Sequence, residues 1–381
     1  MSRIRIDGLS KSYRRTLALD RIDLDIEPAS LTVFCGPPGS GKSVLMRVLI
    51  GLEAPSSGRI LFDGEDITGF PAAARSIGYV PQSFALFPHM SVFDNIAYPM
   101  ALQRVPRAEI AVRVRQAAEM LRIAPLLEKR PSQLSGGEKQ RAAIARGILK
   151  NASIFILDDP LVGLDFKLRE SLMEDLKDMR AEIDATFLYV TSDSLEAMTM
   201  AEQFVLMDRG HIVQAGPVET VYHEPALLRA AELLGFPRCN ILAGEFDAAS
   251  ALCTTPLGRF AVAVENGAAP GEAEIAIRPE HIAPAIGATA PLAVGTIRLT
   301  ENLGSESVVH LGIGNTTLVT TVPAASLARL DLGDSFPFTI RSAGPIVFDR
   351  ATGRRIGRAT PEAEASSASI STPGLPVAGH D

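Results

Sequence analysis

A short glycine-rich stretch at residues 36–43 constrains the fold of this chain more than any other feature. It reads Gly-Pro-Pro-Gly-Ser-Gly-Lys-Ser, and it stands between an apolar run at 31–35 and a second apolar run at 44–50. The first run is rich in β-branched and aromatic residues and predicts a strand, whereas the second predicts a helix. The predicted order is therefore strand, glycine loop, helix.

Two further apolar runs, at residues 154–157 and 187–190, extend this pattern along the chain. Each run is continuous rather than alternating, which is expected of a strand buried on both faces of a sheet. Between them, apolar residues recur at steps of four, four, three and four, typical of one helix face: Leu168, Leu172, Leu176, Met179 and Ile183. Strands that alternate with helices predict an α/β core with a largely parallel sheet.

The pattern of the chain changes outside this core. Residues 83–135 are helical and charged in pattern, which predicts a helical insertion within an α/β domain that spans residues 1–234. Residues 359–381 are rich in Ala, Ser, Pro and Glu, and we expect them not to fold. Residues 235–358 predict an all-β domain or barrel, because Gly, Pro and Asn separate short β-rich pieces at 274–278, 294–298, 307–311 and 316–321.

Composition narrows the class of protein. The net charge of −7 argues against a protein that binds nucleic acid through its backbone phosphates, because such proteins carry a basic face. No apolar run approaches the roughly 18 residues of a membrane span, and residues 1–6 alternate like a strand rather than a signal peptide. We therefore expect a cytosolic protein that needs a partner for any membrane association. The three cysteines, Cys35, Cys239 and Cys253, are scattered and lack metal-ligand spacing, which suits a reducing compartment. Cys35 ends an apolar run and is predicted to be a buried structural thiol.

The glycine-rich stretch matches the phosphate-loop pattern, in which a Gly and any four residues precede Gly-Lys and a Ser or Thr. Its glycines allow backbone N–H groups to converge on phosphate oxygens, and the following helix turns the positive end of its dipole to the same anion. Lys42 is predicted to reach the β- and γ-phosphates of ATP, and the Ser43 hydroxyl to bind Mg²⁺. A plain glycine turn is the alternative. The predicted nucleotide-binding residues of this stretch are Gly36, Pro37, Pro38, Gly39, Ser40, Gly41, Lys42, Ser43 and Val44.

Asp158 is the predicted partner of Ser43 at the metal. It follows the apolar run at 154–157, and a buried strand that ends in a carboxylate can place it beside the phosphate loop, where it holds Mg²⁺ through water. Alone this signal is weak, because strands often end in Asp where a turn begins. Together with the phosphate loop, it predicts a site for ATP and Mg²⁺.

Residues 134–141 read Leu-Ser-Gly-Gly-Glu-Lys-Gln-Arg and resemble the signature motif of ABC ATPases. Ser135, Gly136 and Gly137, with Glu138 beside them, stand just before an apolar helix. Hydroxyl and backbone N–H groups in this position can bind a second phosphate at the helix N-terminus. An N-cap followed by flexible glycines is the alternative.

The resemblance to ABC ATPases runs over residues 4–234 without a break and implies further roles. It implies that Tyr13 stacks on adenine and that Gln82 senses Mg²⁺ and the attacking water. Residues 161–165 resemble the loop that crosses to a partner subunit, with Asp165 at its end. In this family two such domains pair head to tail, and each ATP lies between the phosphate loop of one domain and the signature of the other.

The same resemblance implies partners. Residues 84–90, an apolar segment interrupted by proline, are similar to the groove that receives a coupling helix from the membrane subunits, although core packing is the alternative for any single residue. The implied assembly contains two membrane-spanning permease subunits, a second cassette and an external solute-binding protein. It places the chain peripherally at the cytoplasmic face of a bacterial inner membrane.

The C-terminal segment resembles the small OB-like regulatory domain of carbohydrate importers of the maltose and glycerol-phosphate type. Related domains also occur on spermidine, iron and molybdate importers, so the solute stays open between a sugar, a polyol such as glycerol and a phosphate ester. Arg278, Glu280 and His281 have the composition of a site, but turn and core salt-bridge roles are the preferred interpretation. The matching segments are residues 277–281, 301–306, 348–349 and 352–353.

Two positions depart from the family pattern. The family has Glu after the Mg²⁺ aspartate, as the general base for water, and this chain has Asp159. The shorter side chain retracts the carboxylate by about 1.5 Å, and a misplacement of about 1 Å can cost on the order of 100-fold in rate. The family has a His that contacts the γ-phosphate where this chain has Ser192, whose hydroxyl is too short to replace an imidazole.

We therefore expect a cassette that binds MgATP, hydrolyses it poorly at its own phosphate loop, and completes the site of a competent, non-identical partner. The candidate catalytic residues are Gln82, Asp159 and Ser192. A homodimer, in which Asp159 suffices and water replaces the His, is the alternative. Non-transport ABC ATPases carry a long coiled-coil insertion, but the stretch between the two motifs here holds no sustained heptads. A regulatory nucleotide sensor that does not hydrolyse ATP also stays open.

Overall fold

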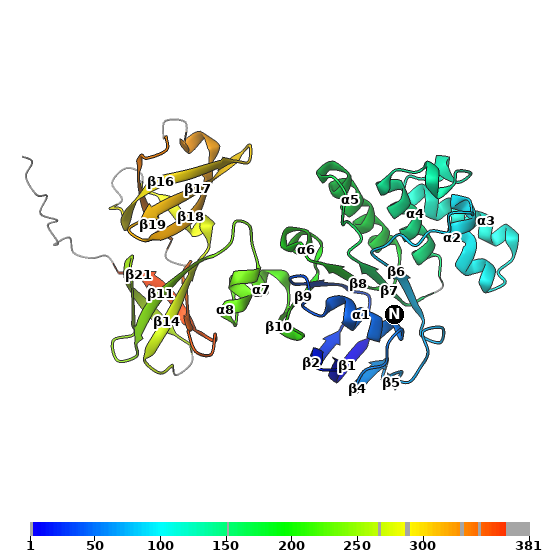
Figure 1. Ribbon diagram of the computed structural model, residues 1–381, viewed down its shortest axis with the longest axis horizontal. Coiled ribbons are helices and arrows are strands. Elements are labelled where there is room, and N and C mark those ends of the chain that lie inside the picture. Colours follow the sequence, from blue (N-terminus) through cyan, green and yellow to red (C-terminus); the bar gives the residue numbers. More distant parts are fainter. Residues whose placement is uncertain are drawn as a thin grey trace, which may run out of the picture. The chain divides into compact units, whose positions relative to one another are not determined.

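The computed structural model describes residues 3–150, 152–265, 268–285, 290–327, 331–341 and 344–362. The chain separates into two compact units, Met1–Phe236 and Pro237–Asp381, and each unit has its own hydrophobic core. The first unit is an α/β structure and the second is built of strands (Figure 1). The two classes of structure predicted for the two parts of the chain are thus confirmed.

The first unit is built around a six-stranded sheet with the order β10-β9-β3-β8-β7-β6. Its strands are parallel except for β10, which pairs antiparallel with β9, so the predicted largely parallel sheet is confirmed. The strands are β3 (Leu31–Cys35), β6 (Ile77–Val80), β7 (Ile154–Asp158), β8 (Thr186–Thr191), β9 (Gln203–Asp208) and β10 (His211–Gly216).

The strands β3, β7 and β8 are buried along their whole length because both faces of the sheet are covered. Val33 and Cys35 pack into the core on the helical face, whereas Phe34 between them packs into the core on the opposite face. That opposite face is covered by α1 (Lys42–Ile50) and by an antiparallel sheet of order β2-β1-β4-β5 (Figure 1). The continuous apolar runs of the sequence reflect this double burial. The antiparallel strands are β1 (Ile4–Tyr13), β2 (Thr16–Ile26), β4 (Ser57–Phe62) and β5 (Glu65–Asp66).

Helices cover the other face of the six-stranded sheet. The apolar stripe predicted between β7 and β8 forms α5, in which Leu172, Leu176 and Met179 are buried. The predicted helical insertion forms α2 and α3, which pack against α4. Among the described residues, no helix has the length and apolar character that a membrane span needs. The helices are α2 (Val92–Leu102), α3 (Arg107–Met120), α4 (Gly136–Ile148), α5 (Phe166–Glu182), α6 (Ser194–Met200), α7 (Val218–His223) and α8 (Leu228–Leu233), with short 3₁₀ turns at Ala124–Leu126 and Pro131–Gln133.

A buried ion pair joins α4 to α5. The carboxylate of Asp175 on α5 is 1% exposed and accepts a hydrogen bond from the Arg141 guanidinium on α4, and Arg122 lies 3.2 Å from its other oxygen. Arg141 also donates to the carbonyl of Leu121 at 3.0 Å and to the hydroxyl of Ser171 at 3.1 Å. The charge of Arg141 is therefore neutralised and its hydrogen-bonding capacity is used within the helical layer.

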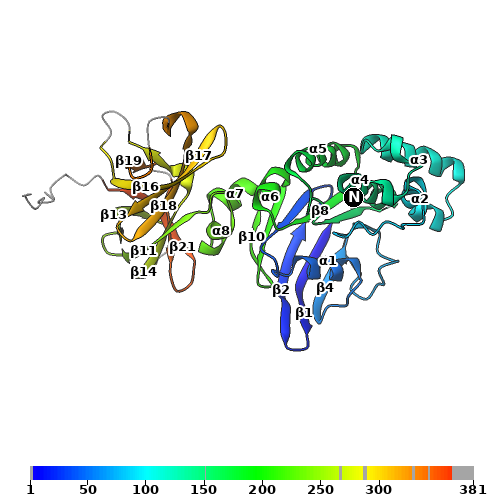
Figure 2. The same ribbon diagram turned by 45° about the horizontal axis from the view of Figure 1, so that its top comes forward.

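The second unit combines a closed barrel, β11-β12-β13-β21-β20-β14, with a five-stranded sheet, β15-β19-β16-β17-β18 (Figure 2). One core serves both, since Phe246 and Phe260 of the barrel pack in the same cluster as Phe336 and Phe338 of the sheet. The strands are β11 (Asn240–Asp247), β12 (Leu252–Thr255), β13 (Gly258–Val264), β14 (Gly271–Ile277), β15 (Ile282–Pro284), β16 (Ala293–Asn302), β17 (Glu306–Ile313), β18 (Thr316–Pro323), β19 (Ser335–Ile340), β20 (Ile346–Asp349) and β21 (Arg355–Pro361).

The C-terminal residues Arg278, Glu280 and His281 lie in and beside a short 3₁₀ turn, Pro279–His281, that joins β14 to β15. Arg278 is buried, and the backbone N–H of His281 donates to its carbonyl at 3.0 Å. Burial lowers the pKa of His281. These contacts agree with the turn and core roles that we preferred for the three residues.

The predicted unfolded tail is wrong at its start. Residues 359–361 belong to β21, where Ala359 is fully buried and Pro361 lies opposite Phe260 of β13. The composition of this stretch is that of a polar tail, but strand pairing closes the barrel there and satisfies its backbone groups. The rest of the predicted tail, residues 363–381, lies outside the described residues.

We predict that Asp175→Ala destabilises the first unit by about 3–5 kcal/mol, because it leaves the Arg141 guanidinium buried without a counter-charge. Denaturant unfolding of the full chain, followed by circular dichroism, measures this as a lower midpoint for the α/β transition. Glu109→Ala is the matched control, since it removes an exposed pair with Arg113 on α3 that contributes about 0.5 kcal/mol or less. Equal midpoints for the two variants would contradict the prediction.

Candidate functional site

The parallel strands bring the predicted site residues to one edge of the sheet. Cys35 at the end of β3 lies opposite Thr191 of β8, Asp158 at the end of β7 lies opposite Val190, and Val80 at the end of β6 lies opposite Leu157. The loops that leave these strands carry the phosphate loop, Asp159, Ser192 and Gln82. In open α/β sheets this edge, at the carboxyl ends of the strands, is where ligands bind.

The phosphate loop needs glycine at two points because of its close backbone contacts. A Cβ atom on Gly36 would lie 2.0 Å from the carbonyl oxygen of Met207, which belongs to the neighbouring strand β9. Gly41 caps α1 with a φ of 101°, and a Cβ there would lie 2.8 Å from the carbonyl oxygen of Ala18. The loop is therefore held against β2 and β9 at these two points, Pro38 and Gly39 between them are exposed, and α1 begins directly at Lys42.

Lys42 is a buried cation at the centre of the loop, with 6% of its surface exposed. Its ammonium donates to the carbonyls of Gly36 at 2.6 Å and Pro37 at 3.2 Å, and to the Ser40 hydroxyl at 3.3 Å. Burial lowers its pKa, and the negative charge of Asp159 is the largest effect that opposes this. Phosphate oxygens are stronger acceptors than carbonyls for such a cation, because they are charged.

Ser43 and Asp158 meet beside this loop, whereas Gln82, the third residue predicted to act at the metal, makes no hydrogen bond to either among the described residues. The Ser43 hydroxyl at the start of α1 donates to Oδ1 of Asp158 at 3.5 Å. Asp158 is 6% exposed, and burial raises its pKa while hydrogen bonds from Tyr79 and Ser43 oppose the rise. A hydroxyl and a carboxylate are the hard oxygen donors that Mg²⁺ prefers. These residues therefore fit a magnesium ion shared with a bound phosphate.

Asp159 follows directly and takes an unusual backbone conformation, with a φ of 47°. Its N–H donates to the carbonyl of Val190 at 2.9 Å, which fixes the turn to the end of β8. Burial raises its pKa, whereas the charge of Lys42 and the backbone N–H of Ser192 lower it. Its Oδ1 is buried and has no hydrogen-bond partner among the described residues. The structure thus brings Asp159, Lys42 and Ser192 together, although the Ser192 side chain itself is exposed.

Gln82 and Tyr13 make no hydrogen bond to Lys42, Ser43 or Asp158 among the described residues. Gln82 is exposed on the loop that follows β6. Tyr13 ends β1, and its hydroxyl hydrogen bonds to Glu53, which also accepts from Arg47 of α1 at 2.7 Å. The ring is 39% exposed, and the Lys11 ammonium lies 5.0 Å from its centre. Tyr13 therefore presents a partly exposed aromatic ring, and Glu53, just beyond the C-terminal end of α1, holds its hydroxyl.

The signature residues form the N-terminus of α4. The Ser135 hydroxyl accepts from the N–H of Glu138 at 3.3 Å, and the Glu138 carboxylate accepts from the N–H of Ser135 at 2.7 Å. This capping box lowers the pKa of Glu138. Ser135 and Gly136 are exposed, whereas a Cβ on Gly137 would lie 2.3 Å from a methyl group of Leu168. No hydrogen bond joins the signature to residues 36–43 within the described part of the chain.

The predicted dimer loop lies beside the signature. Asp165 caps α5 by accepting from the N–H of Leu168 at 3.0 Å, and Leu168 is the residue that packs on Gly137. Two large apolar side chains on either side of Asp165 are exposed, Val162 at 50% and Phe166 at 79%. The exposed start of α4 and this apolar loop form one continuous part of the surface.

Sequence reasoning missed a second layer of buried groups behind the site. The Tyr79 hydroxyl on β6 donates to Oδ2 of Asp158 at 3.2 Å. The buried Tyr189 hydroxyl contacts Glu196 of α6, and burial raises the pKa of Glu196 to about 7. Nothing in the sequence pairs residues so far apart, and no pattern singled out Tyr79 or Glu196.

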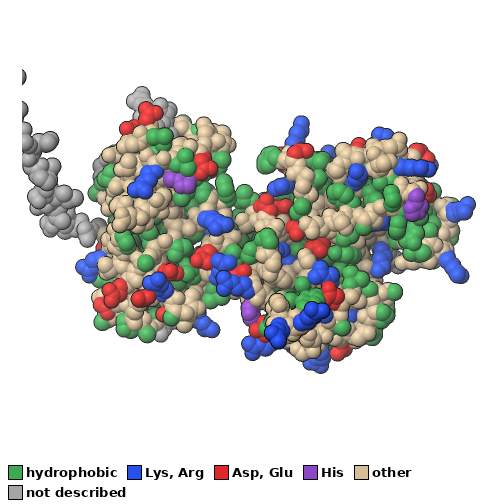
Figure 3. Space-filling model, in the orientation of Figure 1, with side chains coloured by type: hydrophobic (Ala, Val, Ile, Leu, Met, Phe, Trp, Pro, Cys, Tyr) green, Lys and Arg blue, Asp and Glu red, His purple; other side chains and the backbone are tan. Residues whose placement is uncertain are grey.

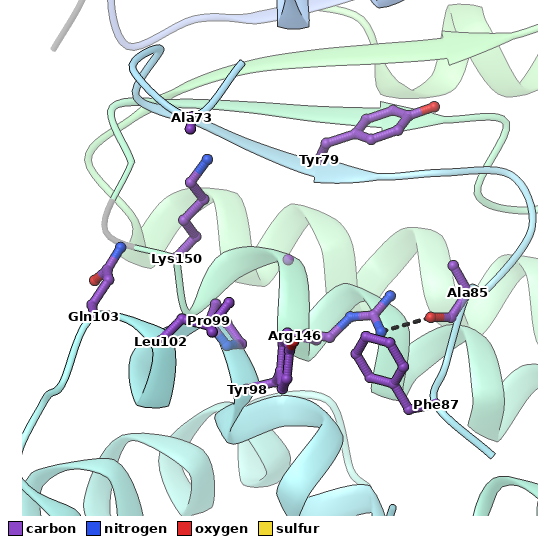
Figure 4. Close-up of a pocket in the computed structure, with 11 residues that line it drawn as sticks. Ala73, Tyr79, Ala85, Phe87, Tyr98, Pro99, Leu102, Gln103, Arg146 and Lys150 are labelled. Carbon is purple, nitrogen blue, oxygen red and sulfur yellow. Dashed lines mark hydrogen bonds between the residues drawn. The ribbon is translucent and has the colours of Figure 1, made fainter. Parts of the chain in front are cut away.

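An apolar groove of about 680 Å³ opens between α2, α4 and the end of β6. Arg146 crosses one side of it and donates to the carbonyls of Ala85 at 2.7 Å and Phe84 at 3.1 Å, with its guanidinium 5.6 Å from the Phe87 ring (Figure 4). Part of the predicted segment 84–90 therefore lines a real groove. We call this the α2–α4 groove; its lining residues are Ala73, Tyr79, Ala85, Phe87, Tyr98, Pro99, Leu102, Gln103, Arg146, Gly147 and Lys150.

On the face drawn in Figure 3, Lys and Arg side chains of the first unit are mixed with Asp, Glu and hydrophobic side chains. Several basic residues of this unit are paired with carboxylates, such as Arg3 with Asp25 at 2.7 Å and Arg169 with Asp193 at 3.1 Å. This distribution differs from the continuous basic surface of a protein that binds nucleic-acid backbones.

Comparison with known proteins extends over both units. A family model for the ABC transporter matches residues 19–162, and a model for the TOBE domain matches residues 275–348. An uncharacterized ABC transporter ATP-binding protein of Bacillus subtilis is 36% identical over 92% of this chain and 99% of its own length. The trehalose/maltose import ATP-binding protein of Thermococcus litoralis is 35% identical over 93% of this chain and 100% of its own. The sn-glycerol-3-phosphate import ATP-binding protein of Burkholderia pseudomallei is 37% identical over 94% of this chain and 100% of its own length.

Solved structures agree with these relatives. The ATP-binding cassette MJ0796, in a dimeric post-hydrolysis state bound to ADP and Pi, is similar to 56% of this chain and 98% of its own, with a TM-score of 0.52 at 26% identity. The matched ABC transporter region includes Lys42, Ser43, Ser135 and Asp158. These three relatives are above 30% identity and cover more than nine-tenths of the chain, so they establish the family for both units. The chain belongs to the ATP-binding proteins of ABC transporters, the ATPase subunits of these machines.

Proposed function

We propose that this chain binds MgATP at the carboxyl edge of its parallel sheet and powers an importer of a sugar, a polyol or a related phosphate ester. The observation that carries this proposal is the meeting of Lys42, Ser43 and Asp158 beside one glycine-rich loop. The relatives named for trehalose/maltose import and sn-glycerol-3-phosphate import support the solute class. The TOBE-domain match in the second unit supports an importer with a C-terminal regulatory domain and does not choose among the solutes.

In this proposal, each residue of the site has a defined part. Backbone N–H groups of the loop and the Lys42 ammonium hold the β- and γ-phosphates. Ser43 and Asp158 hold Mg²⁺, which neutralises the charge that develops on the phosphate oxygens. Tyr13 stacks on adenine from the end of β1, and Gln82 lies at the γ-phosphate side. Electrostatic positioning of this kind is the main source of catalysis in phosphoryl transfer.

A second cassette completes the site. The Ser135 hydroxyl and the N–H groups at the start of α4 are exposed, as a helix N-terminus must be to bind another subunit's phosphate. The exposed side chains of Val162 and Phe166 beside Asp165 support a protein contact at the same surface. The similar cassette MJ0796 is dimeric in its solved structures. Each ATP then lies between the phosphate loop of one subunit and the signature of the other.

The importer also needs membrane partners. We propose that a coupling helix of each of two permease subunits docks in the α2–α4 groove, and that an external solute-binding protein delivers the solute. The groove supports this because it is apolar, open to solvent and lined by the loop that follows Gln82. The chain is then peripheral at the cytoplasmic face of the inner membrane.

Hydrolysis at the chain's own loop is proposed to be weak. The Asp159 carboxylate is one carbon shorter than a glutamate, its Oδ1 has no partner among the described residues, and its backbone is fixed by Val190. It therefore has little freedom to move toward an attacking water. Ser192 is exposed, and its short side chain carries no imidazole to contact the γ-phosphate. The binding residues are kept, so we propose a heterodimer in which a non-identical cassette hydrolyses most of the ATP.

We predict that Lys42→Ala raises the Kd for a fluorescent ATP analogue in the presence of Mg²⁺ by at least about tenfold. A hydrogen bond to a charged group contributes about 1.5–3 kcal/mol, and Lys42 makes such contacts to two phosphates. Equilibrium titration followed by fluorescence anisotropy measures the change. Lys177→Ala, an exposed residue of α5, is the control and should bind like the unmodified chain. Undiminished binding by Lys42→Ala would refute the nucleotide site.

We predict that the double substitution Asp159→Glu with Ser192→His raises the steady-state ATPase rate of the isolated chain by about 10- to 100-fold. The longer carboxylate can approach the attacking water and the imidazole can contact the γ-phosphate, and a misplacement of about 1 Å in such groups can cost on the order of 100-fold in rate. A phosphate-release assay at saturating MgATP measures the rate. Adding Asp158→Asn to the double variant should abolish the gain, which assigns it to this site. A fast ATPase in the unmodified chain alone would contradict the proposal.

The pairing itself has a separate test. We predict that the chain, affinity-purified from detergent-solubilised membranes of its own host, carries a second, different ABC cassette in about equal amount, together with two permease subunits. Quantitative mass spectrometry measures the ratio. A preparation that contains permease subunits but this cassette alone would establish the homodimer and leave the importer function intact.

A further inference from the structure

Tyr79 links two features that the sequence treats separately, the Mg²⁺ aspartate and the α2–α4 groove. It lies on β6, opposite Ile156 of β7, so that Tyr79, Ile156 and Asp158 share one face of the sheet. Its hydroxyl donates to Oδ2 of Asp158 at 3.2 Å, and the same residue lines the groove (Figure 4). The residue lines the groove, but its side chain packs with Ile156 on the α1 face of the sheet, where its hydroxyl contacts the predicted metal ligand.

The two oxygens of Asp158 have different partners. Oδ2 accepts from Tyr79, whereas Oδ1 accepts from Ser43 at 3.5 Å. A carboxylate held at one oxygen has a fixed plane, and its second oxygen then faces the hydroxyl of Ser43 and the end of the phosphate loop. A carboxylate oxygen accepts, so the Tyr79 hydroxyl is the donor in this hydrogen bond. Outer-shell hydrogen bonds of this kind orient metal-binding carboxylates in many proteins.

We propose that Tyr79 is a positioning residue that orients Asp158 for Mg²⁺ from the edge strand β6. The proposal rests on the proposed function, since it assigns Mg²⁺ to Ser43 and Asp158. It adds a residue that no motif of the sequence contains. Because Tyr79 also belongs to the lining of the α2–α4 groove, the metal site and the proposed docking surface share one structural element, the strand β6.

The test is the Mg²⁺ dependence of nucleotide binding by the full-length chain. Tyr79→Phe keeps the ring and its packing and removes only the hydroxyl. The Mg²⁺ concentration that gives half of the Mg²⁺-dependent gain in affinity for a fluorescent ATP analogue should rise about tenfold, in line with other outer-shell losses. The Kd in EDTA should stay unchanged. Tyr98→Phe is the matched control, because Tyr98 lines the same groove and packs on Phe87, with ring centres 4.8 Å apart.

Asp158→Asn separates failure of this inference from failure of the proposed function. If Asp158→Asn shifts the Mg²⁺ curve and Tyr79→Phe does not, the positioning role is overturned while the metal site stands. If neither substitution shifts the curve, the assignment of Mg²⁺ to Asp158 fails and the inference fails with it. A weaker Kd in EDTA for Tyr79→Phe would indicate a structural role and would also overturn the proposal.

A double-substitution cycle gives a readout that a merely structural role would not produce. Because Tyr79 acts through Asp158, Tyr79→Phe should cause no further shift of the Mg²⁺ curve in a chain that already carries Asp158→Asn. Additive shifts would mean that the two residues act independently and would overturn the inference. The unfolding midpoint of each variant, measured under the same conditions, confirms that the compared chains are folded.

Discussion

Parallel hydrogen bonding between β3, β8, β7 and β6 places the carboxyl ends of four strands at one edge of a sheet, and the site depends on this constraint. Each strand is apolar until its last residues because both faces of the sheet are buried, and polar groups can begin only where the sheet ends. The phosphate loop, Asp158, Ser192 and Gln82 therefore converge without any contact between their sequence motifs. One strand slipped by one residue would turn Asp158 to the opposite face, away from Ser43.

Burial also sets the electrostatics of this edge. It lowers the pKa of Lys42 and raises the pKa of Asp158 and Asp159, so each of these charges is costly unless it has a partner. The charges offset one another, since Asp159 opposes the shift at Lys42 and Lys42 opposes the shift at both carboxylates. In the proposed complex, a triphosphate with Mg²⁺ would add one anion and one cation to the same place, where each would meet an existing counter-charge. Nucleotide binding and the folded charge arrangement therefore favour each other.

The sequence predicted the elements of the site better than their contacts. Continuous apolar runs identified β3, β7 and β8 to within a residue, and the spacing of leucines identified α5, because a buried strand and an amphipathic helix leave a local pattern. Composition failed at Ala359, whose place in β21 is set by pairing with a strand almost a hundred residues earlier in the chain. The hydrogen bond from Tyr79 to Asp158 left no signal either, since it depends on which strands become neighbours. The resemblance to a family supplied the roles of Tyr13, Gln82 and Ser135, which no pattern in this chain could establish by itself.

The division between kept and altered residues follows the structure of the site. The groups proposed to hold the phosphates and the metal follow β3, begin α1 and end β7, and Lys42, Ser43 and Asp158 among them lie in contact distance of the phosphate loop or of one another. The two altered residues, Asp159 and Ser192, follow adjacent strands, and the backbone hydrogen bond from Asp159 to Val190 ties their turns together. Both substitutions shorten a side chain on the side where water would attack, and neither removes a contact within the phosphate loop. Random loss of function would fall on binding and hydrolysis alike. If hydrolysis alone is lost, as we propose, while the exposed signature of α4 is kept, this is the pattern expected of a cassette that still closes around a partner's nucleotide.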